Sequence, residues 1–266
     1  MDDEQPVLST DERRHQMLAV VGEKGFARVV DLSAAFGVSK VTVRSDLDAL
    51  AGGGAVRRIR GGAISTDVAS LQERPFEEVQ VEARSQKARI AATAVDLIDS
   101  GMSIILDVGT TTAAIADELL RRDRLRDVTV ITNGLSIALA LEPAIPRIQV
   151  IVSGGALRPL QHSLVAPLGA VLLQQVRADI AFVGCNGVDA TAGITNINLP
   201  EAEIKRAMIA SASEVVVVAD GSKIGRVRLG MIAPMTDVDM IITDHAAPAT
   251  ALQELRDLDG PHVVTV

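Results

Sequence analysis

The sequence has almost no aromatic side chains, and this absence restricts the kind of core that it can build. Of its 266 residues only 2 % are aromatic, with four Phe and neither Trp nor Tyr. The hydrophobic fraction of 48 % is nevertheless enough for a substantial core in two domains. That core must consist of Val, Ile, Leu and Ala, a composition that suits buried parallel strands covered by helices.

Cysteine and long apolar runs are also scarce. The single cysteine, Cys185, cannot form an internal disulfide, and no His or Cys neighbours it at metal-ligand spacing. We therefore expect Cys185 to be a small buried residue, and we expect no metal site and no cofactor. No window approaches the ~18 consecutive apolar residues of a membrane span, and the acidic start of the chain is the wrong charge for a signal peptide. We expect a cytoplasmic protein without a membrane partner.

Positive charge is in deficit over the whole chain but not at its N-terminal end. The chain has 26 Lys and Arg against 34 Asp and Glu, a net charge of −8. The first 64 residues carry nine of each kind, and residues 24–64 carry seven basic against three acidic side chains. A polyanion would bind this local positive segment rather than the acidic remainder.

Residues 11–52 have the pattern of a helix-turn-helix. A helix begins at Asp11, a second covers residues 30–36, and Gly37 and Val38 supply a tight turn before a third helix. Ser39 caps this third helix, in which apolar residues recur at i, i+4 and i+7 on the inner face. The polar side chains on its outer face would reach base edges in a major groove.

A small hairpin, or wing, is predicted over residues 55–64, after the break formed by three glycines at 52–54. Three arginines lie in four positions beside the glycines at 61 and 62, where guanidinium groups can reach phosphates or a minor groove. A generic three-helix bundle would share the apolar spacing, but it would not account for the wing. The residues expected to contact DNA are Ser39, Lys40, Thr42, Arg44, Ser45, Arg57, Arg58, Arg60 and Gly61.

Residues 38–50 together with 57–63 resemble the DNA-binding signature of DeoR-type (GlpR-type) bacterial regulators of sugar metabolism. The sequence departs from the family pattern at Ser45, where a second arginine is usual, and at Arg60, where a histidine is usual. The resemblance implies a DNA-binding repressor of carbohydrate-metabolism genes. We assign residues 1–64 to the winged helix-turn-helix domain and residues 65–84, which have neither a helical nor a strand period, to a linker.

From residue 85 to 266 helical and strand patterns alternate, which indicates an α/β domain with a mostly parallel sheet. Seven short strands are expected, at residues 104–106, 128–131, 149–152, 180–183, 215–218, 241–242 and 263–266. Polar loops follow five of them directly. Because the carboxyl ends of parallel strands meet at one edge of a sheet, these loops predict a ligand pocket there.

The loop 109–112 offers backbone N–H groups, three threonine hydroxyls and a helix N-terminus, which suit an oxyanion such as a phosphate. It lacks the Gly-Lys-[Ser/Thr] sequence of a nucleotide P-loop. Lys205 and Lys223 are the candidates for bringing positive charge to the pocket, although Lys205 could equally be a solvated residue on its helix. The four histidines are scattered, and we expect incidental roles for them.

The DeoR-type resemblance continues through this domain at residues 107–112, 132–134, 153–155, 187–193, 203–206 and 219–225. It implies a fold similar to that of ribose-5-phosphate isomerase and a sugar-phosphate effector. It also implies release from the operator when the effector binds. We expect operator DNA, this effector and further copies of the chain, in a dimer or tetramer, as partners. The residues expected to bind the effector are Asp107, Gly109, Thr110, Thr111, Thr112, Thr132, Asn133, Gly154, Gly155, Gly187, Asp189, Lys205 and Lys223.

Two other functions compete with this interpretation. The first is a sugar-phosphate isomerase with an accessory DNA-binding domain, but the segment 187–193 has one carboxylate where such enzymes have a denser acidic cluster. We therefore expect no enzyme activity. The second is a DNA-binding protein whose rear domain only oligomerises, which would not need convergent polar loops.

Overall fold

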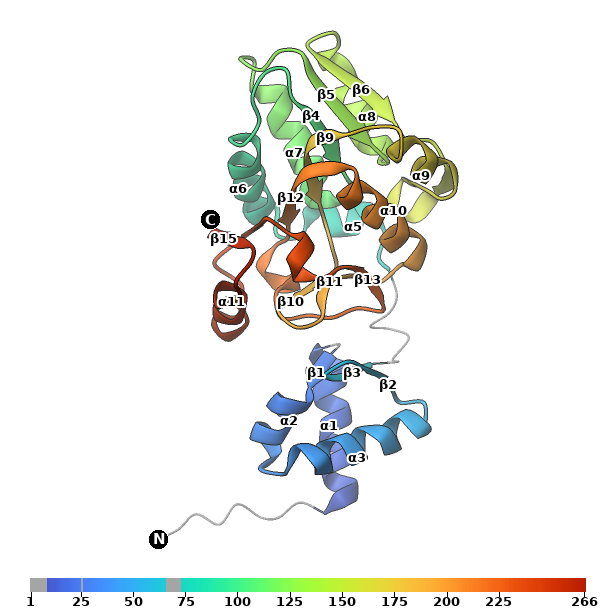
Figure 1. The fold of residues 1–266 in the computed structure, drawn as a ribbon, viewed down its shortest axis with the longest axis vertical. Coiled ribbons are helices and arrows are strands. Elements are labelled where there is room, and N and C mark those ends of the chain that lie inside the picture. The colour runs from blue at the N-terminus through green and yellow to red at the C-terminus, as the bar shows by residue number, and fades with distance from the viewer. Residues whose placement is uncertain (1–8, 25, 66–72) are drawn as a thin grey trace. The chain divides into compact units, whose positions relative to one another are not determined.

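The computed structural model describes residues 9–24, 26–65 and 73–266, which divide into two units (Figure 1). The first unit contains three helices and three strands among its described residues. They are α1 (Thr10–Lys24), β1 (Phe26–Arg28), α2 (Val29–Phe36), α3 (Lys40–Gly52), β2 (Val56–Ile59) and β3 (Gly62–Ser65). The strands form an antiparallel sheet in the order β1-β3-β2.

The first unit is a helix-turn-helix followed by a wing, as the sequence predicts. Gly37 ends α2 in the left-handed conformation, with φ of 63°, and the Ser39 hydroxyl accepts a hydrogen bond from the Thr42 N–H at the start of α3. Val43 and Leu47 are fully buried, whereas Leu50 is partly buried against the same core. Strand β1 was not predicted, because three residues show too little alternation to indicate a strand.

The second unit is built on a seven-stranded sheet in which every neighbouring pair is parallel. All seven predicted strands are present. Their bounds are β4 (Ser103–Leu106), β5 (Val128–Thr132), β6 (Ile148–Val152), β9 (Ala178–Val183), β12 (Ala212–Val218), β14 (Met240–Thr243) and β15 (His262–Thr265).

Helices cover both faces of this sheet, which explains its continuous apolar runs. Ile104 and Leu106 pack into one apolar cluster with helices α6 (Arg84–Val95), α7 (Thr110–Arg121) and α8 (Leu135–Leu141). Ile105, between them in β4, packs into another cluster with α9 (Leu168–Leu173) and α10 (Leu199–Ala210). Helix α11 (Ala249–Arg256) packs in a third cluster with β12 and β14.

The strand order β15-β14-β12-β9-β4-β5-β6 reverses between β4 and β9. From β4 the chain moves outward through β5 to β6, then returns to place β9 on the other side of β4. Helices on either side of such a reversal lie on opposite faces, which leaves a crevice at the carboxyl ends of the two central strands. The sheet therefore has its topological switch point at β4 and β9.

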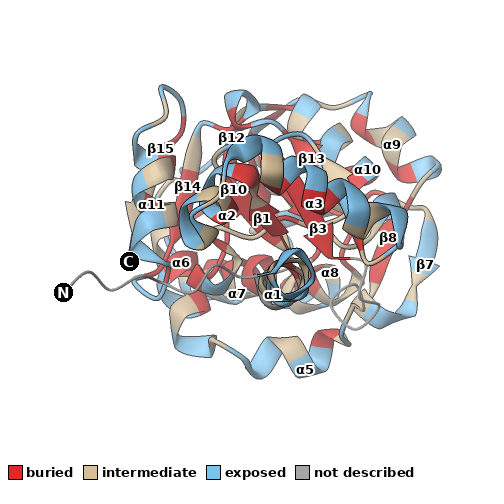
Figure 2. Ribbon diagram, turned by 90° about the horizontal axis from the view of Figure 1, so that it is seen from below, coloured by how far each residue is buried: buried red, intermediate tan, exposed pale blue. Residues whose placement is uncertain are grey.

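Two smaller sheets were not predicted. An antiparallel hairpin joins β7 (Ala156–Arg158) to β8 (Ser163–Val165), and a second antiparallel sheet contains β10 (Gly187–Asp189), β11 (Gly193–Asn196) and β13 (Gly230–Ala233). Figure 2 shows that β8 is buried whereas β7 beside it is exposed. Short 3-10 turns complete the unit, at Glu142–Ala144 (η1), Pro159–Gln161 (η2), Gly221–Lys223 (η3) and Met235–Asp237 (η4).

The range 65–84, predicted as a linker, contains ordered structure at both ends. Ser65 is the last residue of β3, and residues 76–81 form the helix α5 (Phe76–Val81), which belongs to the second unit. Residues 66–72 lie outside the described part. Among the residues that are described, no helix combines the length and the apolar character needed to cross a membrane.

The two glycines before the β7–β8 hairpin provide a test of its geometry. Gly155 has φ of 128°, and an added Cβ would lie 2.2 Å from the Val165 carbonyl oxygen, whereas Gly154 has φ of 73° and open space around it. Gly154→Ala should cost about 1–2 kcal/mol, the penalty of a left-handed backbone for an L-residue. Gly155→Ala should cost clearly more, because the strand β8 must also move. Thermal melting of the full chain measures both, and equal losses would contradict this account of the hairpin.

Candidate functional site

The polar loops that the sequence predicts to converge do lie together. They follow β12, β9, β4, β5 and β6, which are consecutive neighbours in the sheet. All five strands are parallel, so the loops leave from the same edge. The candidate site is therefore the carboxyl edge of the sheet, centred on its switch point.

A buried ion pair between Asp107 and Lys205 lies at the centre of this edge. Asp107 follows β4 with no exposed surface, and Lys205 on α10 is 2 % exposed. The Lys205 ammonium also donates to the Gly184 carbonyl at 3.0 Å, and the Gly184 N–H donates to Asp107 Oδ2 at 3.0 Å. This triangle joins β4, the end of β9 and α10. Lys205 is thus a buried site residue and not a solvated one.

Asp107 is not fully satisfied by these contacts. Burial raises the pKa of its carboxyl to about 6, even though the charge and hydrogen bond of Lys205 lower it. Its second oxygen, Oδ1, has no hydrogen-bond partner among the described residues, although it is buried. A buried acceptor without a partner is costly, and it fits a hydroxyl or amine donor from a ligand.

The neighbouring loops are held by side chains that the sequence singled out. Asn133, fully buried after β5, accepts from the Val108 N–H at 2.8 Å and so ties the β5 loop to the β4 loop. The hydroxyl of Thr132 accepts from the Gly134 N–H at 3.0 Å, and that of Thr112 donates to the Gly109 carbonyl at 3.0 Å. These groups fix the loop backbones rather than point freely outward.

The first turn of α7 contains the three predicted threonines. Thr111 and Thr112 are buried, at 8 % and 0 % exposure, whereas Thr110 lines a cavity of about 230 Å³. The same cavity is lined by Lys87, whose ammonium donates to the Val79 and Glu82 carbonyls, both at 2.7 Å. Burial lowers the pKa of Lys87. Lys87 was not predicted as a site residue, because nothing in its helix pattern separates it from a solvated lysine.

Other predicted residues have mainly structural surroundings. Gly187 and Asp189 lie in strand β10, and Asp189 Oδ1 accepts from the N–H groups of Thr191 and Ala192, both at 2.9 Å. Gly154 and Gly155 shape the entry to the β7–β8 hairpin. Lys223 is half-buried at the end of η3. Their contacts give no separate evidence for an effector.

Cys185, directly after Gly184, packs partly buried against an apolar cluster. Burial raises the pKa of its thiol to about 12, so the thiol stays protonated at neutral pH. In the described ranges no group of three His, Cys, Asp or Glu side chains is arranged to hold a metal ion.

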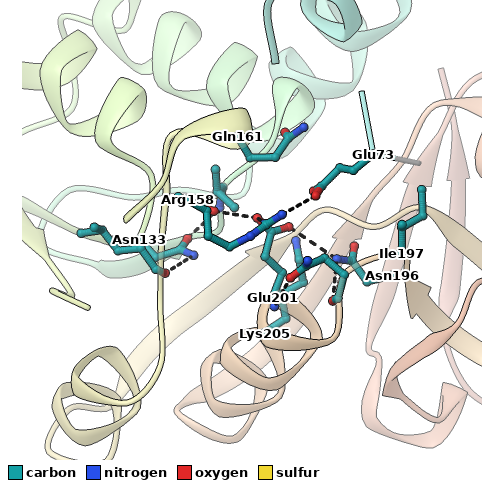
Figure 3. Close-up of polar contacts among 12 residues, drawn as sticks. Glu73, Asn133, Arg158, Gln161, Asn196, Ile197, Glu201 and Lys205 are labelled. Atoms are coloured by element: carbon teal, nitrogen blue, oxygen red, sulfur yellow. Dashed lines mark hydrogen bonds and ion pairs between the residues drawn. The ribbon is translucent and has the colours of Figure 1, made fainter. Parts of the chain in front are cut away.

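A second buried charge cluster adjoins the site and was missed by the sequence analysis. The guanidinium of Arg158 in β7 lies between the carboxylates of Glu73 and Glu201 and pairs with both (Figure 3). Glu201 is 4 % exposed and lies one helical turn before Lys205 on α10. That i, i+4 spacing is the only sequence signal of the cluster, since Glu73 and Arg158 are far away in the chain.

In the first unit, helix α3 presents a polar exposed face. Lys40, Arg44 and Ser45 are exposed, as are Arg57, Arg60 and Gly61 in the wing. Arg58 is less exposed, because its guanidinium pairs with Asp48 at 2.9 Å and donates to the Gly62 carbonyl at 2.9 Å. Val41 was not predicted as a contact, yet it is 71 % exposed on the same helix.

The opposite face of α3 is anchored by a buried carboxylate, that of Asp46. It accepts from Arg13 at 2.7 Å and from Arg14 at 2.9 Å, both on α1. Burial alone would raise the pKa of Asp46, but the hydrogen bonds and charges of the two arginines outweigh it and lower the pKa. The orientation of α3 relative to α1 is thus fixed by charge as well as by apolar packing.

Comparison with known proteins identifies both units. Residues 13–69 match the DeoR-like helix-turn-helix domain, and residues 82–245 match the DeoR C terminal sensor domain. Relatives match over nearly the whole chain. One from Escherichia coli O157:H7, named as a candidate repressor of the aga operon, is 37 % identical and covers 99 % of this chain and 96 % of its own.

Two further comparisons extend this result. The glycerol-3-phosphate regulon repressor of Escherichia coli K12 is 29 % identical over 94 % of this chain and 97 % of its own. Among solved structures, ribose 5-phosphate isomerase A from Methanocaldococcus jannaschii matches 53 % of this chain and 54 % of its own, with 24 % identity and a TM-score of 0.39.

The Asp107–Lys205 pair makes a testable prediction about stability. Lys205→Met should destabilise the chain by about 3–5 kcal/mol, because it leaves a carboxylate buried without its cation. The loss should grow as the pH rises from 5 to 8. The charge and hydrogen bond of Lys205 lower the pKa of Asp107, so without them this pKa lies higher still, and ionising the buried carboxyl opposes folding more strongly than in wild type. Thermal melting across this range measures the effect.

The double variant Asp107→Asn/Lys205→Met serves as the control, since it removes both charges together. Its melting temperature should be closer to that of wild type than the melting temperature of Lys205→Met is. The difference from wild type should also not grow between pH 5 and 8. Losses that simply add would show that the two side chains are not energetically coupled.

Proposed function

The chain belongs to the DeoR family of transcription regulators, and from this membership we propose that it represses carbohydrate-metabolism genes until a phosphorylated sugar or sugar derivative releases it from its operator. The family's members regulate transcription, and the chain is a DNA-binding regulator rather than an enzyme. The identity of the genes and the direction of the response are part of the proposal.

The observation that carries the effector proposal is the unsatisfied Oδ1 of Asp107 among five converging polar loops. A polyol hydroxyl is the donor that such an oxygen lacks. The N-terminal turn of α7, with its backbone N–H groups and the hydroxyl of Thr110, supports a phosphate group on the same ligand. A phosphorylated polyol would use both features at once.

The DNA proposal rests on the exposed outer face of α3 and on the wing. Lys40, Arg44 and Ser45 would lie in the major groove, where an arginine reads guanine through two hydrogen bonds. The exposed side chain of Val41 would contact a thymine methyl group. Since one recognition helix per chain makes few base contacts, we propose that the chain acts as a symmetric oligomer on repeated half-sites.

Substitution of two arginines distinguishes contacts that read the base sequence from contacts to phosphates. Arg44→Ala should cost about 1–3 kcal/mol of binding free energy and relax the preference at one base position. Arg60→Ala should weaken binding evenly across sequences and lower the salt slope by about 1. Fluorescence anisotropy with a duplex selected from a random pool, titrated at several salt concentrations, distinguishes the two, and an unchanged salt slope for Arg60→Ala would count against the wing assignment.

The effector class is tested by a thermal-shift screen of the full chain with matched pairs, each sugar or polyol with and without its phosphate. A ligand that binds only the folded state raises the melting temperature as its concentration exceeds its Kd. Only the phosphorylated members should do so. Equal shifts within the pairs would contradict a phosphate at α7.

Two variants then test the site itself. Thr111→Val keeps the shape of the side chain but deletes its hydroxyl, and Lys223→Met removes a charge while keeping the aliphatic stem. Both should keep wild-type operator affinity and need more effector for release. Loss of operator binding in the absence of effector would show instead that these loops support the fold or the oligomer.

A further inference from the structure

The β7–β8 hairpin touches both the sheet-edge site and the segment 73–82. This segment follows residues 66–72, which in the sequence lead back to β3 of the DNA-binding unit. Of its two strands, β8 is buried in the second unit, whereas β7 is largely exposed (Figure 2).

On the site side, the buried strand β8 is hydrogen-bonded to the β5 loop. The Leu164 N–H donates to the Asn133 carbonyl at 2.8 Å, and the Asn133 side chain donates back to the Leu164 carbonyl at 3.1 Å. Asn133 also holds the Val108 N–H, directly after Asp107. One buried amide, that of Asn133, thus joins the loop between β4 and α7 to β8.

A second connection on the site side runs through α10. The Ser163 hydroxyl donates to Glu201 at 2.6 Å, and Glu201 lies one turn before Lys205, the partner of Asp107. Glu201 also receives the Asn196 amide at 3.4 Å and the guanidinium of Arg158 (Figure 3).

Away from the site, three residues of the hairpin contact the segment 73–82: Arg158, Gln161 and His162. Arg158 pairs with Glu73, and the Gln161 amide donates to the Arg74 carbonyl at 2.6 Å. The His162 ring stacks on Phe76 with centroids 5.7 Å apart, and its Nε2 lies 3.1 Å from a Glu77 carboxylate oxygen.

Arg158 is the residue that both sides share. Its side chain is 18 % exposed, and those of Glu73 and Glu201 are 13 % and 5 % exposed, so water screens the three charges poorly. One guanidinium balances two carboxylates that repel each other. A ligand that changes the position or charge balance of Glu201 therefore changes how strongly Arg158 holds Glu73.

On the basis of the proposed function, we propose that the β7–β8 hairpin couples occupancy of the sheet-edge site to the segment 73–82, with Arg158 as its positioning residue. The site would thus control the point at which the chain leaves the sensor unit toward the DNA-binding unit.

Hydrogen exchange of the full chain tests this without any ligand. Glu201→Gln removes the charge on the site side, and no hydrogen bond or ion pair described above joins Glu201 to residues 73–82. If Arg158 transmits the change, amides within 76–82 should exchange about tenfold faster in this variant, as they should in Arg158→Met. Arg158→Lys, which keeps the charge but loses the two-pronged geometry, should lie between wild type and Arg158→Met.

Arg122→Met provides the matched control. Arg122 also bridges two carboxylates, Glu118 at 2.8 Å and Asp96 at 3.1 Å, but it lies on neither the hairpin nor the segment. It should change exchange in 76–82 far less than Arg158→Met does. Its partner Glu118 lines a cavity with Gln80 and Val81, but the ion pairs of Arg122 itself are with Glu118 and Asp96. If Glu201→Gln fails to fold, Ser163→Ala, which removes only one donor from Glu201, replaces it. Unchanged exchange in 76–82 for the folded Glu201 or Ser163 variant would overturn the proposal.

A second measurement connects the hairpin to regulation. The probes are sn-glycerol 3-phosphate and D-ribose 5-phosphate, added to the selected duplex bound by wild type or by Arg158→Met. Arg158→Met should still bind the probe that shifts wild-type melting, so its own thermal shift with that probe should be unchanged. The probe should no longer weaken its duplex binding: the ratio of duplex Kd with probe to duplex Kd without probe should fall toward 1. For a typical allosteric coupling this ratio is about 5–150. Release at the wild-type probe concentration would overturn the hairpin as the coupling element. A wild type unresponsive to both probes would count against the proposed effector class, whereas the exchange measurement decides the hairpin by itself.

Discussion

The second unit depends on a buried salt bridge placed at the one point where its sheet reverses direction. Asp107 and Lys205 connect the end of β4, the end of β9 and helix α10 through charged groups. Such a pair is expensive to bury, and its replacement by apolar side chains would often be neutral for stability. Its value lies in the polarity that it maintains inside the crevice, where an oxygen of Asp107 still lacks a donor.

The DNA-binding unit uses a related arrangement for another purpose. Asp46 lies on the buried face of α3 and is held by two arginines from α1, so this face of the helix is fixed while its opposite face stays polar and exposed. The buried carboxylate of Asp46 orients the recognition helix, whereas the buried carboxylate of Asp107 still has an oxygen without a hydrogen-bond donor. The difference follows from the number of donors around each: Asp46 has a guanidinium on each oxygen, whereas Asp107 has donors on only one.

The parts of the fold that were predictable are those with strong local patterns. The seven main strands are short apolar runs, five of them followed directly by polar loops, and Ser39 with Gly37 defines the turn of the helix-turn-helix. The strands β1, β7, β8, β10, β11 and β13 have three or four residues each and pair across irregular loops, so neither period nor composition reveals them. In the site, Lys205 could be placed on a helix but not assigned to burial, because its partner is 98 positions away. Arg158 and Glu73 were missed for the same reason. Lys87 has partners close by in the sequence, and it was missed because nothing in its helix pattern separates it from a solvated lysine.

The arrangement of the hairpin also affects the order in which the chain can acquire its structure. Among the described residues, the main apolar cluster of the first unit consists of residues between 17 and 63, whereas Glu73, at the start of the next described segment, has its charged partner at residue 158. Synthesis proceeds from the N-terminus, and domains generally fold as units while it does. A ribosome therefore delivers the residues of this cluster before it has made the arginine that holds Glu73. During that interval the nascent protein has its recognition helix and wing but lacks the hairpin that we propose controls them.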